Sequence, residues 1–590
     1  MTASEKKHDL LNWIGLAAIC AFFVVARWKK MGSLLWLDPA RWLNEFSRVA
    51  HGEMPYRDFS FQYPPFAAFL YGWLLRWFGI TFTNVQIITD LIDLAIVVLC
   101  YLLIRQLLPR GLHLAAGGLL VAVCATSLMN FNFFSYVSYI PSLQTGAVGA
   151  LVFLLGQLRY LREGRLGAAG WAMVVAGGFI AVLSKPEYAL AVGCATGLLA
   201  WISCDWKLGA KLGCAAIGPA LVVYVLVARV VGLDNLRAGI GGYGLATAFC
   251  PWWPTGVGVF GILGALGEAT FVGAVLSFHD KLKRRLPLGL VGGAFFFAYL
   301  AYQNKYALIE PMVPLVERIR RIAPSVLYTS SILQPVMWVS IVAFLVFAWR
   351  LRKRPEDSGL LLILLWPVVM ATRSLFGSTQ SIFPEVTAVD YPFLLVLAPY
   401  LLWRYLKSTA TVATIVIAYS LLRVAGGWPD LLSDRKYGVL DTPAGSVKLL
   451  NYDTDSQVYR YVMDHTKPGD YLLDLPYGGG LNFATDRPSP IFTTQLAGMG
   501  WAPEFQQRDL DLLQRHPPHL IVAQDEANLG TFWGFGMRGD RACTCPHLVW
   551  APSAASWDAH YVFPIVTYIG KHYQVRARFG DKILLEPVLQ

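Results

Sequence analysis

Apolar runs of membrane-spanning length recur along the first 425 residues, and this feature constrains the fold more than any other. Each run has about 17–22 residues, enough for one helix across a bilayer. Only 15% of all residues are charged, against about 25% in soluble domains. We therefore predict a mainly α, polytopic transmembrane helical bundle. The candidate spans are 11–27, 64–80, 87–105, 114–131, 142–159, 166–184, 187–204, 210–231, 256–278, 286–302, 328–349, 358–373, 389–405 and 409–426.

The distribution of charge predicts how the bundle is oriented. Short basic loops mark the cytoplasmic side of membrane proteins, and four such loops alternate with longer, less basic connections. They are 159–165, 206–211, 279–285 and 350–354. Lys6 and Lys7 place the N-terminus inside as well, whereas the loops place everything after 427 outside. An inside N-terminus and an outside C-terminus require an odd number of crossings, so about 13 helices cross. One candidate between 64 and 160 must then be re-entrant or half-spanning.

The last 160 residues differ in composition from the rest. From Asp434 onward there are 14 Lys and Arg against 17 Asp and Glu, a net −3, so the preceding part carries +14. Apolar runs shorten, and helical and strand patterns alternate. Helices are expected at 456–465 and 504–516, and strands at 471–475, 518–523, 573–579 and 582–586. We predict a transmembrane module at 1–430 and an extracytoplasmic α/β domain at 431–590.

The first outer loop, 28–64, combines carboxylates with aromatic rings beside the membrane. Ionisable groups near a bilayer are expensive and usually functional. Asp38 has two interpretations: as the N-cap of a helix whose first residue is Pro39, or as a base that takes a proton from a hydroxyl. Glu45 is seven residues further on and is either on the same face or solvated and paired. Asp58 either orders the loop or serves as a second acid.

Further candidates for contact with substrate lie in and beyond this loop. Lys185 and Glu187 flank Pro186 between two apolar runs. The turn is either an interfacial cap with an internal salt bridge or a site where the lysine binds a phosphate. Arg373 stands near a membrane exit, where it either snorkels or binds phosphate. The remaining candidates are Arg57 and Tyr63 in the first loop and Trp253 in a Gly- and Trp-rich outer loop.

Three short motifs resemble a known group of membrane enzymes. They are Gly-x-x-Pro-Tyr-x-Asp-Phe at 52–59 with Tyr63-Pro64-Pro65, Leu-x-Lys-Pro-Glu at 183–187, and Asp390-Tyr391-Pro392. Together with the order of loop, helices and C-terminal domain, they resemble the GT-C superfamily of polytopic glycosyltransferases. The nearest kin are the protein O-mannosyltransferases and lipid A aminoarabinose transferases.

The resemblance implies a reaction and its participants. It implies a sugar donor linked to a polyprenyl phosphate, transfer with inversion to a glycan, lipid or protein acceptor, and a position in the plasma membrane with the C-terminal domain outside. It assigns the general base to Asp38 and its acidic partner to Asp58. Here Asp38 is followed by Pro39 instead of a second acid, and Asp58 precedes Pro64 by six residues, so the second assignment is the weaker. No protein metal ligands stand out, and a divalent cation such as Mg²⁺ or Mn²⁺ is left open.

Two other classes of function compete with this one. A transporter or flippase of a lipid-linked substrate would use charges inside the membrane, for which Asp90 and Asp93 are candidates, although no inverted repeat is visible. A non-catalytic assembly subunit would use the C-terminal domain for binding. Nucleic acid is not an expected partner, because the basic residues are scattered between helices.

Overall fold

The fold is that of a computed structural model, which describes most but not all of the 590 residues. The described residues are 3–30, 37–126, 133–134, 141–243, 344–345, 348–349, 358–376, 391–432, 438–449, 452–475, 479–494, 503–524 and 564–588. The predicted spans 256–278 and 286–302, and nearly all of 328–349, lie outside them.

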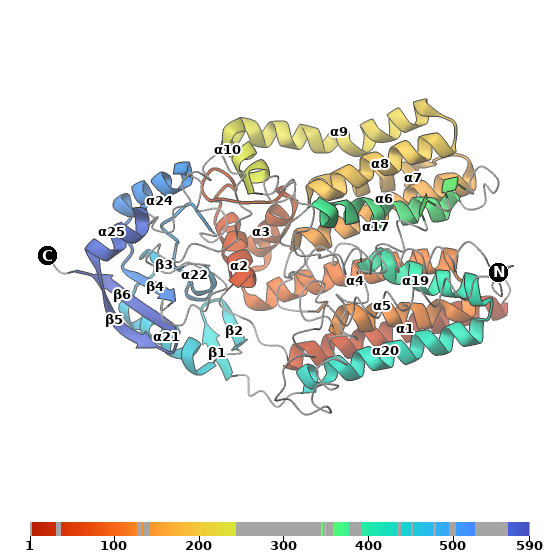
Figure 1. The fold of residues 1–590 in the computed structure, drawn as a ribbon. Helices are drawn as coiled ribbons and strands as arrows, with labels where there is room; N and C mark the ends of the chain where they lie inside the picture. Colours follow the sequence, from red (N-terminus) through yellow and green to blue (C-terminus); the bar gives the residue numbers. More distant parts are fainter. Residues whose placement is uncertain are drawn as a thin grey trace, which may run out of the picture.

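Long helices form a bundle with the N-terminus at one end and the C-terminal strands beyond the other (Figure 1). The helices of the bundle are α1 (Ala3–Lys30), α4 (Phe82–Leu107), α5 (His113–Thr126), α6 (Pro141–Glu163), α7 (Ala168–Val182), α8 (Pro186–Ile202), α9 (Trp206–Val231), α17 (Ser358–Phe376), α19 (Tyr391–Leu406) and α20 (Thr409–Leu432). Among the described residues, α1, α4, α6 and α9 are long and apolar enough to cross a membrane. The chain is a membrane protein, and each of these helices falls on a predicted span.

Helices α6 and α7 approach each other through glycines. A Cβ added at Gly177 would come 2.3 Å from the backbone N of Phe153, and one at Gly149 would come 2.5 Å from the N of Ala181. Helices in a membrane associate by close packing of this kind, since lipid supplies no hydrophobic drive between them.

Short elements lie between the bundle and the C-terminal strands. They are α2 (Leu37–Ala50), α3 (Phe66–Phe78), α10 (Leu233–Arg237) and the one-turn π-helix η2 (Ala238–Tyr243); a one-turn 3₁₀ helix, η1 (Arg110–Leu112), precedes α5 at the far end. Helix α2 starts at Leu37, one residue before the predicted N-cap. It is packed on every side, with all residues from Ala40 to Ala50 buried.

Helix α3 corresponds to the predicted span 64–80 but is shorter than a bilayer core is thick. Its 13 residues extend about 20 Å, less than the ~30 Å of a hydrocarbon core. At its start Phe66 N–H donates to Leu183 O, and at its end the Asn84 amide donates to Phe78 O, so both ends lie on the side of the C-terminal strands. Trp73 and Trp77 are exposed, as aromatic anchors at a membrane surface are. The sequence left open which span between 64 and 160 does not cross, and both ends of α3 lie at the same end of the bundle.

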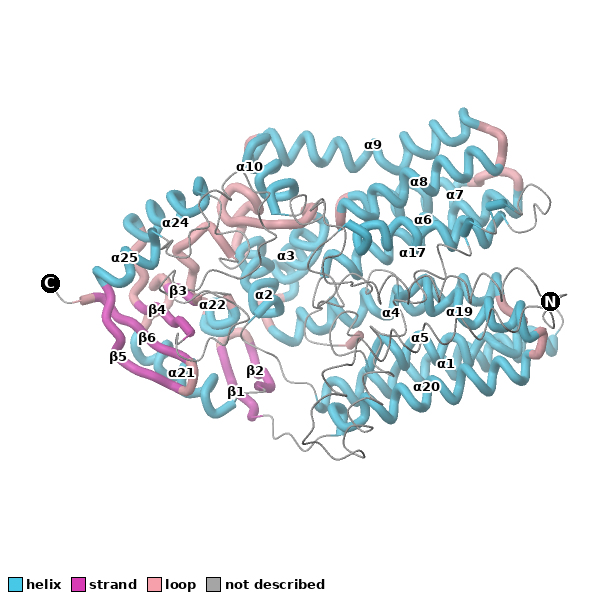
Figure 2. Tube along the Cα trace, in the orientation of Figure 1, coloured by secondary structure: helices cyan, strands magenta, loops and turns pink. Residues whose placement is uncertain are grey.

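All strands in the described residues lie in the C-terminal region, which we define as residues 438–588 (Figure 2). A hairpin, β1 (Gly438–Thr442) and β2 (Gly445–Leu449), precedes a four-stranded sheet of order β3-β4-β6-β5. Its strands are β3 (Leu472–Asp474), β4 (Leu520–Gln524), β5 (Tyr573–Phe579) and β6 (Lys582–Pro587), with only the β3–β4 pair parallel. The helices of the region are α21 (Tyr452–His465), α22 (Gly480–Thr485), α24 (Pro503–Arg515) and α25 (Pro564–His572). The helices and strands expected here coincide with α21, α24 and β3 to β6.

One continuous apolar core links the C-terminal region to the bundle. Phe82, at the start of α4, packs edge-on against Phe483 of α22 with ring centroids 4.8 Å apart. The Phe82 N–H also donates to Ala444 O in the β1–β2 turn. Lys448 of β2 donates to Trp28 O near the end of α1 at 2.7 Å. These contacts fix the C-terminal region against one end of the bundle.

Candidate functional site

Helix α2 buries three charged side chains on one face. Arg41, Glu45 and Arg48 stand at i, i+4 and i+7, so they share that face, and none is more than 8% exposed. The Arg41 Nε lies 3.6 Å from Glu45 Oε1, and the Thr494 hydroxyl donates to the same oxygen at 2.6 Å. Buried charges are tolerated only when paired and hydrogen-bonded. This face, which we call the α2 ionic face, therefore depends on a threonine from the C-terminal region.

Arg48 organises the loop that follows α2. Its guanidinium donates to Glu53 Oε2 at 2.7 Å, to Asp58 O at 2.9 Å and to Ile491 O at 3.0 Å. It also lies over the Phe59 ring, 4.9 Å from the centroid. The fork geometry of arginine suits several acceptors at once. One side chain thus joins α2, the loop and the C-terminal region.

Asp58 and Arg57 form a pair at the outer edge of this loop. Arg57 donates to both carboxylate oxygens of Asp58, at 2.9 and 2.7 Å, and the Met54 N–H donates to Oδ2 at 2.7 Å. Partial burial raises the pKa of Asp58, but hydrogen bonds from Arg57 and from the Met54 N–H lower it more, so it lies below its ordinary value. A carboxylate held this way is a weak proton acceptor. Its contacts correspond to the loop-ordering interpretation of Asp58.

Tyr63, Lys185 and Glu187 come together, although 122 residues separate the first two. The Lys185 ammonium lies 5.3 Å from the centroid of the Tyr63 ring and 3.7 Å from Glu187 Oε1, and Lys185 is 2% exposed. The junction is anchored because the Ser184 hydroxyl bonds that of Thr145 at 3.0 Å. The lysine is therefore held in place at the start of α8, next to the first loop.

Aromatic rings continue this contact back to α2. The rings of Tyr63 and Trp42 have centroids 5.4 Å apart, and the Arg41 guanidinium lies 4.4 Å from the centroid of Trp42. Arg41, Trp42, Tyr63 and Lys185 thus form a row in which cations stand at both ends of two rings. We call it the cation–aromatic row. Cations over ring faces are attracted by the ring quadrupole.

The other predicted site residues are described less fully. Asp38 lies within α2, one turn before Trp42, and Arg373 lies within α17, but the structure describes the backbone alone at both positions. Trp253 lies outside the described residues. Asp90 and Asp93 lie on α4: Asp90 accepts from Trp28 Nε1 at 2.6 Å, and Asp93 accepts from the Phe134 N–H at 2.8 Å and from Gln144 at 2.5 Å.

The segment 490–494 closes the site from the C-terminal side. The Ser60 N–H donates to Phe492 O at 2.7 Å, and the Thr494 N–H donates to Ser60 Oγ at 2.9 Å. Asp509 of α24 accepts from the N–H groups of Phe492 and Thr493 at 2.8 and 3.0 Å. Burial raises the pKa of Asp509 to about 6 against the lowering effect of these bonds.

The sequence analysis missed Arg48 and Thr494 and left Glu45 undecided. The spacing of Arg41, Glu45 and Arg48 was the available signal, but charges at i, i+4 and i+7 usually mark a solvated helix face. Thr494 lies 449 residues from Glu45 and carried no signal.

No group of three His, Cys, Asp or Glu side chains suited to a metal ion occurs within the part of the chain that the structure describes. No protein-family model matches the sequence, and no curated protein matches it significantly. Solved structures do resemble the fold.

Two of these structures cover most of this chain. ArnT from Cupriavidus metallidurans, bound to undecaprenyl phosphate, is 12% identical with a TM-score of 0.49, over 98% of this chain and 97% of that one. The oligosaccharyltransferase AglB from Archaeoglobus fulgidus, in complex with an inhibitory peptide and a dolichol-phosphate, is 13% identical with a TM-score of 0.44, over 89% and 71%. Both belong to the GT-C superfamily that the motifs of this sequence resemble. At these identities, what this chain does has to be argued from its own residues.

Proposed function

We propose that this protein is a membrane glycosyltransferase that moves a sugar from a polyprenyl-phosphate donor to an acceptor hydroxyl on the outer side of the membrane. The cation–aromatic row carries the proposal. A lipid-linked sugar needs a cation for its phosphate, flat rings for its sugar and a base for the incoming hydroxyl. We assign these three roles to Lys185, to the ring of Tyr63, which packs on the buried Trp42, and to Asp38, one helical turn before Trp42.

The proposed reaction uses these residues as follows. The acceptor oxygen attacks the anomeric carbon, the bond from that carbon to the phosphate oxygen breaks, and the configuration inverts. The proton of the acceptor hydroxyl passes to the Asp38 carboxylate, and the lipid phosphate leaves with the bonding electrons. Lys185 stabilises the charge that develops on the phosphate, an effect that commonly dominates such catalysis. Arg373 is a second candidate for the phosphate, and Trp253 for the sugar.

The orientation of the protein is part of the proposal. The turns at the end of the bundle that carries the N-terminus are rich in cations, in keeping with a cytoplasmic location. The start of α1, the α4–α5 turn with η1, and the α6–α7, α8–α9 and α19–α20 turns carry Lys6, Lys7, Arg105, Arg110, Arg159, Arg162, Arg165, Lys207, Lys211 and Lys407. The protein would then lie in the plasma membrane, with the C-terminal region, at the other end, on the extracytoplasmic side. There it holds the first loop in place and borders the side on which a glycan, lipid or protein acceptor arrives.

The test measures release of radiolabelled sugar from a panel of polyprenyl-phosphate donors by the purified protein in nanodiscs. Asp38→Asn should abolish release while leaving donor binding intact, and Lys185→Gln should lower kcat more than Lys185→Arg does. Asp234→Asn, an exposed acid of α10, is the matched control. Release in the presence and absence of a chelator decides whether Mg²⁺ or Mn²⁺ takes part. No release from any donor, or equal release by wild type and Asp38→Asn, would overturn the proposal.

A further inference from the structure

Tyr56, in the loop that follows α2, has a backbone conformation that aromatic residues rarely adopt. Its φ is 69°, in the left-handed region, where a bulky side chain is an outlier. The Tyr56 N–H donates to Phe59 O at 2.8 Å, and the residue is 1% exposed, so the conformation is held from several directions. Strained residues of this kind persist only where the surroundings fix them, and they cluster at active sites and ligand clamps. The contacts of Tyr56 therefore indicate what the strain serves.

The hydroxyl of Tyr56 donates to the backbone carbonyl of Tyr63. In the cation–aromatic row Tyr63 lies between Trp42 and Lys185, and it is partly exposed whereas Trp42 is fully buried. Burial raises the pKa of Tyr56 well above its ordinary value, so the hydroxyl keeps its proton and remains a donor. The bond therefore fixes the backbone from which the Tyr63 ring projects.

The ring of Tyr56 is held by η2. A Cβ added at Gly239 would come 2.4 Å from Tyr56 Cδ1 and 2.8 Å from Phe61 O, so the backbone of η2 lies directly on this ring and on the loop. Single π-helical turns are frequent at functional sites. The ring of Phe61 meets those of Tyr56 and Tyr63 edge to face, with centroids 5.9 and 6.4 Å apart. The hydroxyl bond and the ring contacts of Tyr56 thus lead to the same side chain, Tyr63.

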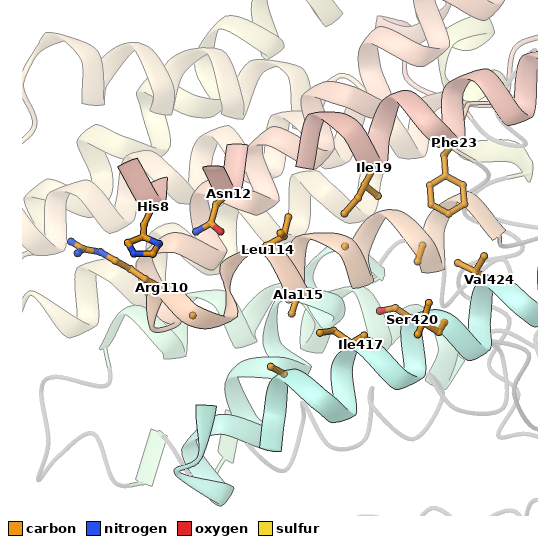
Figure 3. Close-up of a pocket in the computed structure, with 15 residues that line it drawn as sticks. His8, Asn12, Ile19, Phe23, Arg110, Leu114, Ala115, Ile417, Ser420 and Val424 are labelled. Carbon is orange, nitrogen blue, oxygen red and sulfur yellow. The ribbon is translucent and has the colours of Figure 1, made fainter. Parts of the chain in front are cut away.

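Packing elsewhere in the molecule is looser. A cavity of about 730 Å³ lies between α1, α5 and α20, and Figure 3 shows Ile19 and Phe23 on one wall and Ile417 and Val424 on the other. The residues that line it come from α1, η1, α5 and α20, and none belongs to the loop that follows α2. The close packing around Tyr56 is therefore a property of this loop and not of the whole fold.

We propose that Tyr56 is a positioning residue that fixes the ring of Tyr63 between Lys185 and Trp42, where the sugar of a lipid-linked donor would stack. A sugar stacked on a ring is placed only as accurately as the ring itself, and a misplacement of about 1 Å can cost about 100-fold in rate. The role in transfer rests on the function proposed above, whereas the placement of the ring does not.

Fluorine NMR of the full-length protein in detergent, with 3-fluorotyrosine at position 63 alone, tests the placement without any substrate. Tyr56→Phe keeps the ring and removes the hydroxyl, and it should shift or broaden the Tyr63 signal. Gly239→Ala should do the same by displacing the Tyr56 ring, with no loss of a polar group. An unchanged signal in Tyr56→Phe, or in Gly239→Ala if Tyr56→Phe does not fold, would overturn the proposal.

Two matched variants serve as controls for this measurement. Tyr573→Phe also removes a buried hydroxyl that donates to a backbone carbonyl, at 2.9 Å, but within the C-terminal region. Gly218→Ala adds a methyl group on α9, where space is open. Both should leave the Tyr63 signal unchanged, and an equal effect of these controls would mean that the signal reports general loosening and would overturn the proposal. Melting temperatures establish that each variant is folded.

A double-mutant cycle in the sugar-release assay tests the role in transfer. Tyr56→Phe should lower kcat about fivefold or more and change KM by less than about twofold, because the phosphate and the polyprenyl chain bind without the Tyr63 ring. In the background of Tyr63→Ala, which removes the ring but keeps the carbonyl, Tyr56→Phe should have no further effect. Equal effects in both backgrounds would mean that Tyr56 supports the loop in general, and would overturn the role in transfer. If wild type releases no sugar, the proposed reaction is wrong, and the fluorine signal still decides whether Tyr56 fixes the ring.

Discussion

Replacing Thr494 by valine should loosen the C-terminal region from α2 by an amount that the contacts define. The substitution keeps the shape of the side chain and removes its hydroxyl, which donates to the buried carboxylate of Glu45 at 2.6 Å. A hydrogen bond to a charged group contributes about 1.5–3 kcal/mol to stability. That free energy corresponds to a factor of about 10–150 in an opening equilibrium.

Hydrogen exchange of single amides measures this opening. The N–H groups of Ser60 and Thr494 donate across the junction, to Phe492 O and Ser60 Oγ, so both should exchange about 10–150 times faster in the variant. The Leu475 N–H, which donates to Val522 O within the sheet at 2.8 Å, should not change. If exchange at the Leu475 N–H accelerates by the same factor, the whole C-terminal region unfolds and the junction does not open as a separate unit.

A matched variant controls for the loss of a buried hydroxyl. Thr485 is fully buried, but its hydroxyl donates at 2.6 Å to Leu481 O within its own helix. Thr485→Val should therefore leave exchange at Ser60 and Thr494 unchanged. An equal effect of the two variants, or an increase below about threefold for Thr494→Val, would refute the argument that the bond to Glu45 holds the junction.

Two further predictions concern packing and pH. Gly177→Ala should destabilise the α6–α7 contact by about 1–3 kcal/mol or more, since its Cβ would come 2.3 Å from the Phe153 nitrogen. Gly197→Ala, with open space around it, should be neutral or slightly stabilising. Thermal unfolding in detergent compares the two variants, and equal melting temperatures would contradict the packing argument. The pKa of Asp509 is raised from 3.8 to about 6 in the folded state, so its contribution to stability is fully present below pH ~4 and is lost as the pH rises to ~6, by roughly 3 kcal/mol. Denaturant unfolding of the Asp509→Asn variant should not show this pH dependence. If the variant keeps the wild-type pH profile, the pH dependence belongs to another group.

Local patterns were sufficient to predict many elements of this fold, but they missed β1, β2, α22 and α25. The helices from α4 to α9 follow from the length of their apolar runs, and β5 and β6 follow from alternation around a Gly-Asp turn. Helix α3 could not be assigned in this way, because its apolar content resembles that of a crossing helix. Only its contacts at both ends show that these ends lie at the same end of the bundle.

The site was predictable in part for a related reason. Tyr63 and Lys185 stood out as polar groups beside apolar runs, but their contact depends on how α8 meets the first loop. The partnership of Glu45 with Thr494 depends on how the C-terminal region docks. Sequence periodicity reports which face of one element is buried, and it carries no information on which distant segment covers that face.

The α2 ionic face shows where this sequence departs from what stability alone favours. A helix packed on every side is most stable with apolar residues, and a buried ion pair seldom gains over a hydrophobic one of the same volume. Helix α2 nevertheless keeps Arg41, Glu45 and Arg48 in its buried part. Departures of this kind are expected at functional sites. Arg41 lies over the ring of Trp42, and Arg48 joins the loop to the C-terminal region, so these charges link the cation–aromatic row to the segments that surround it.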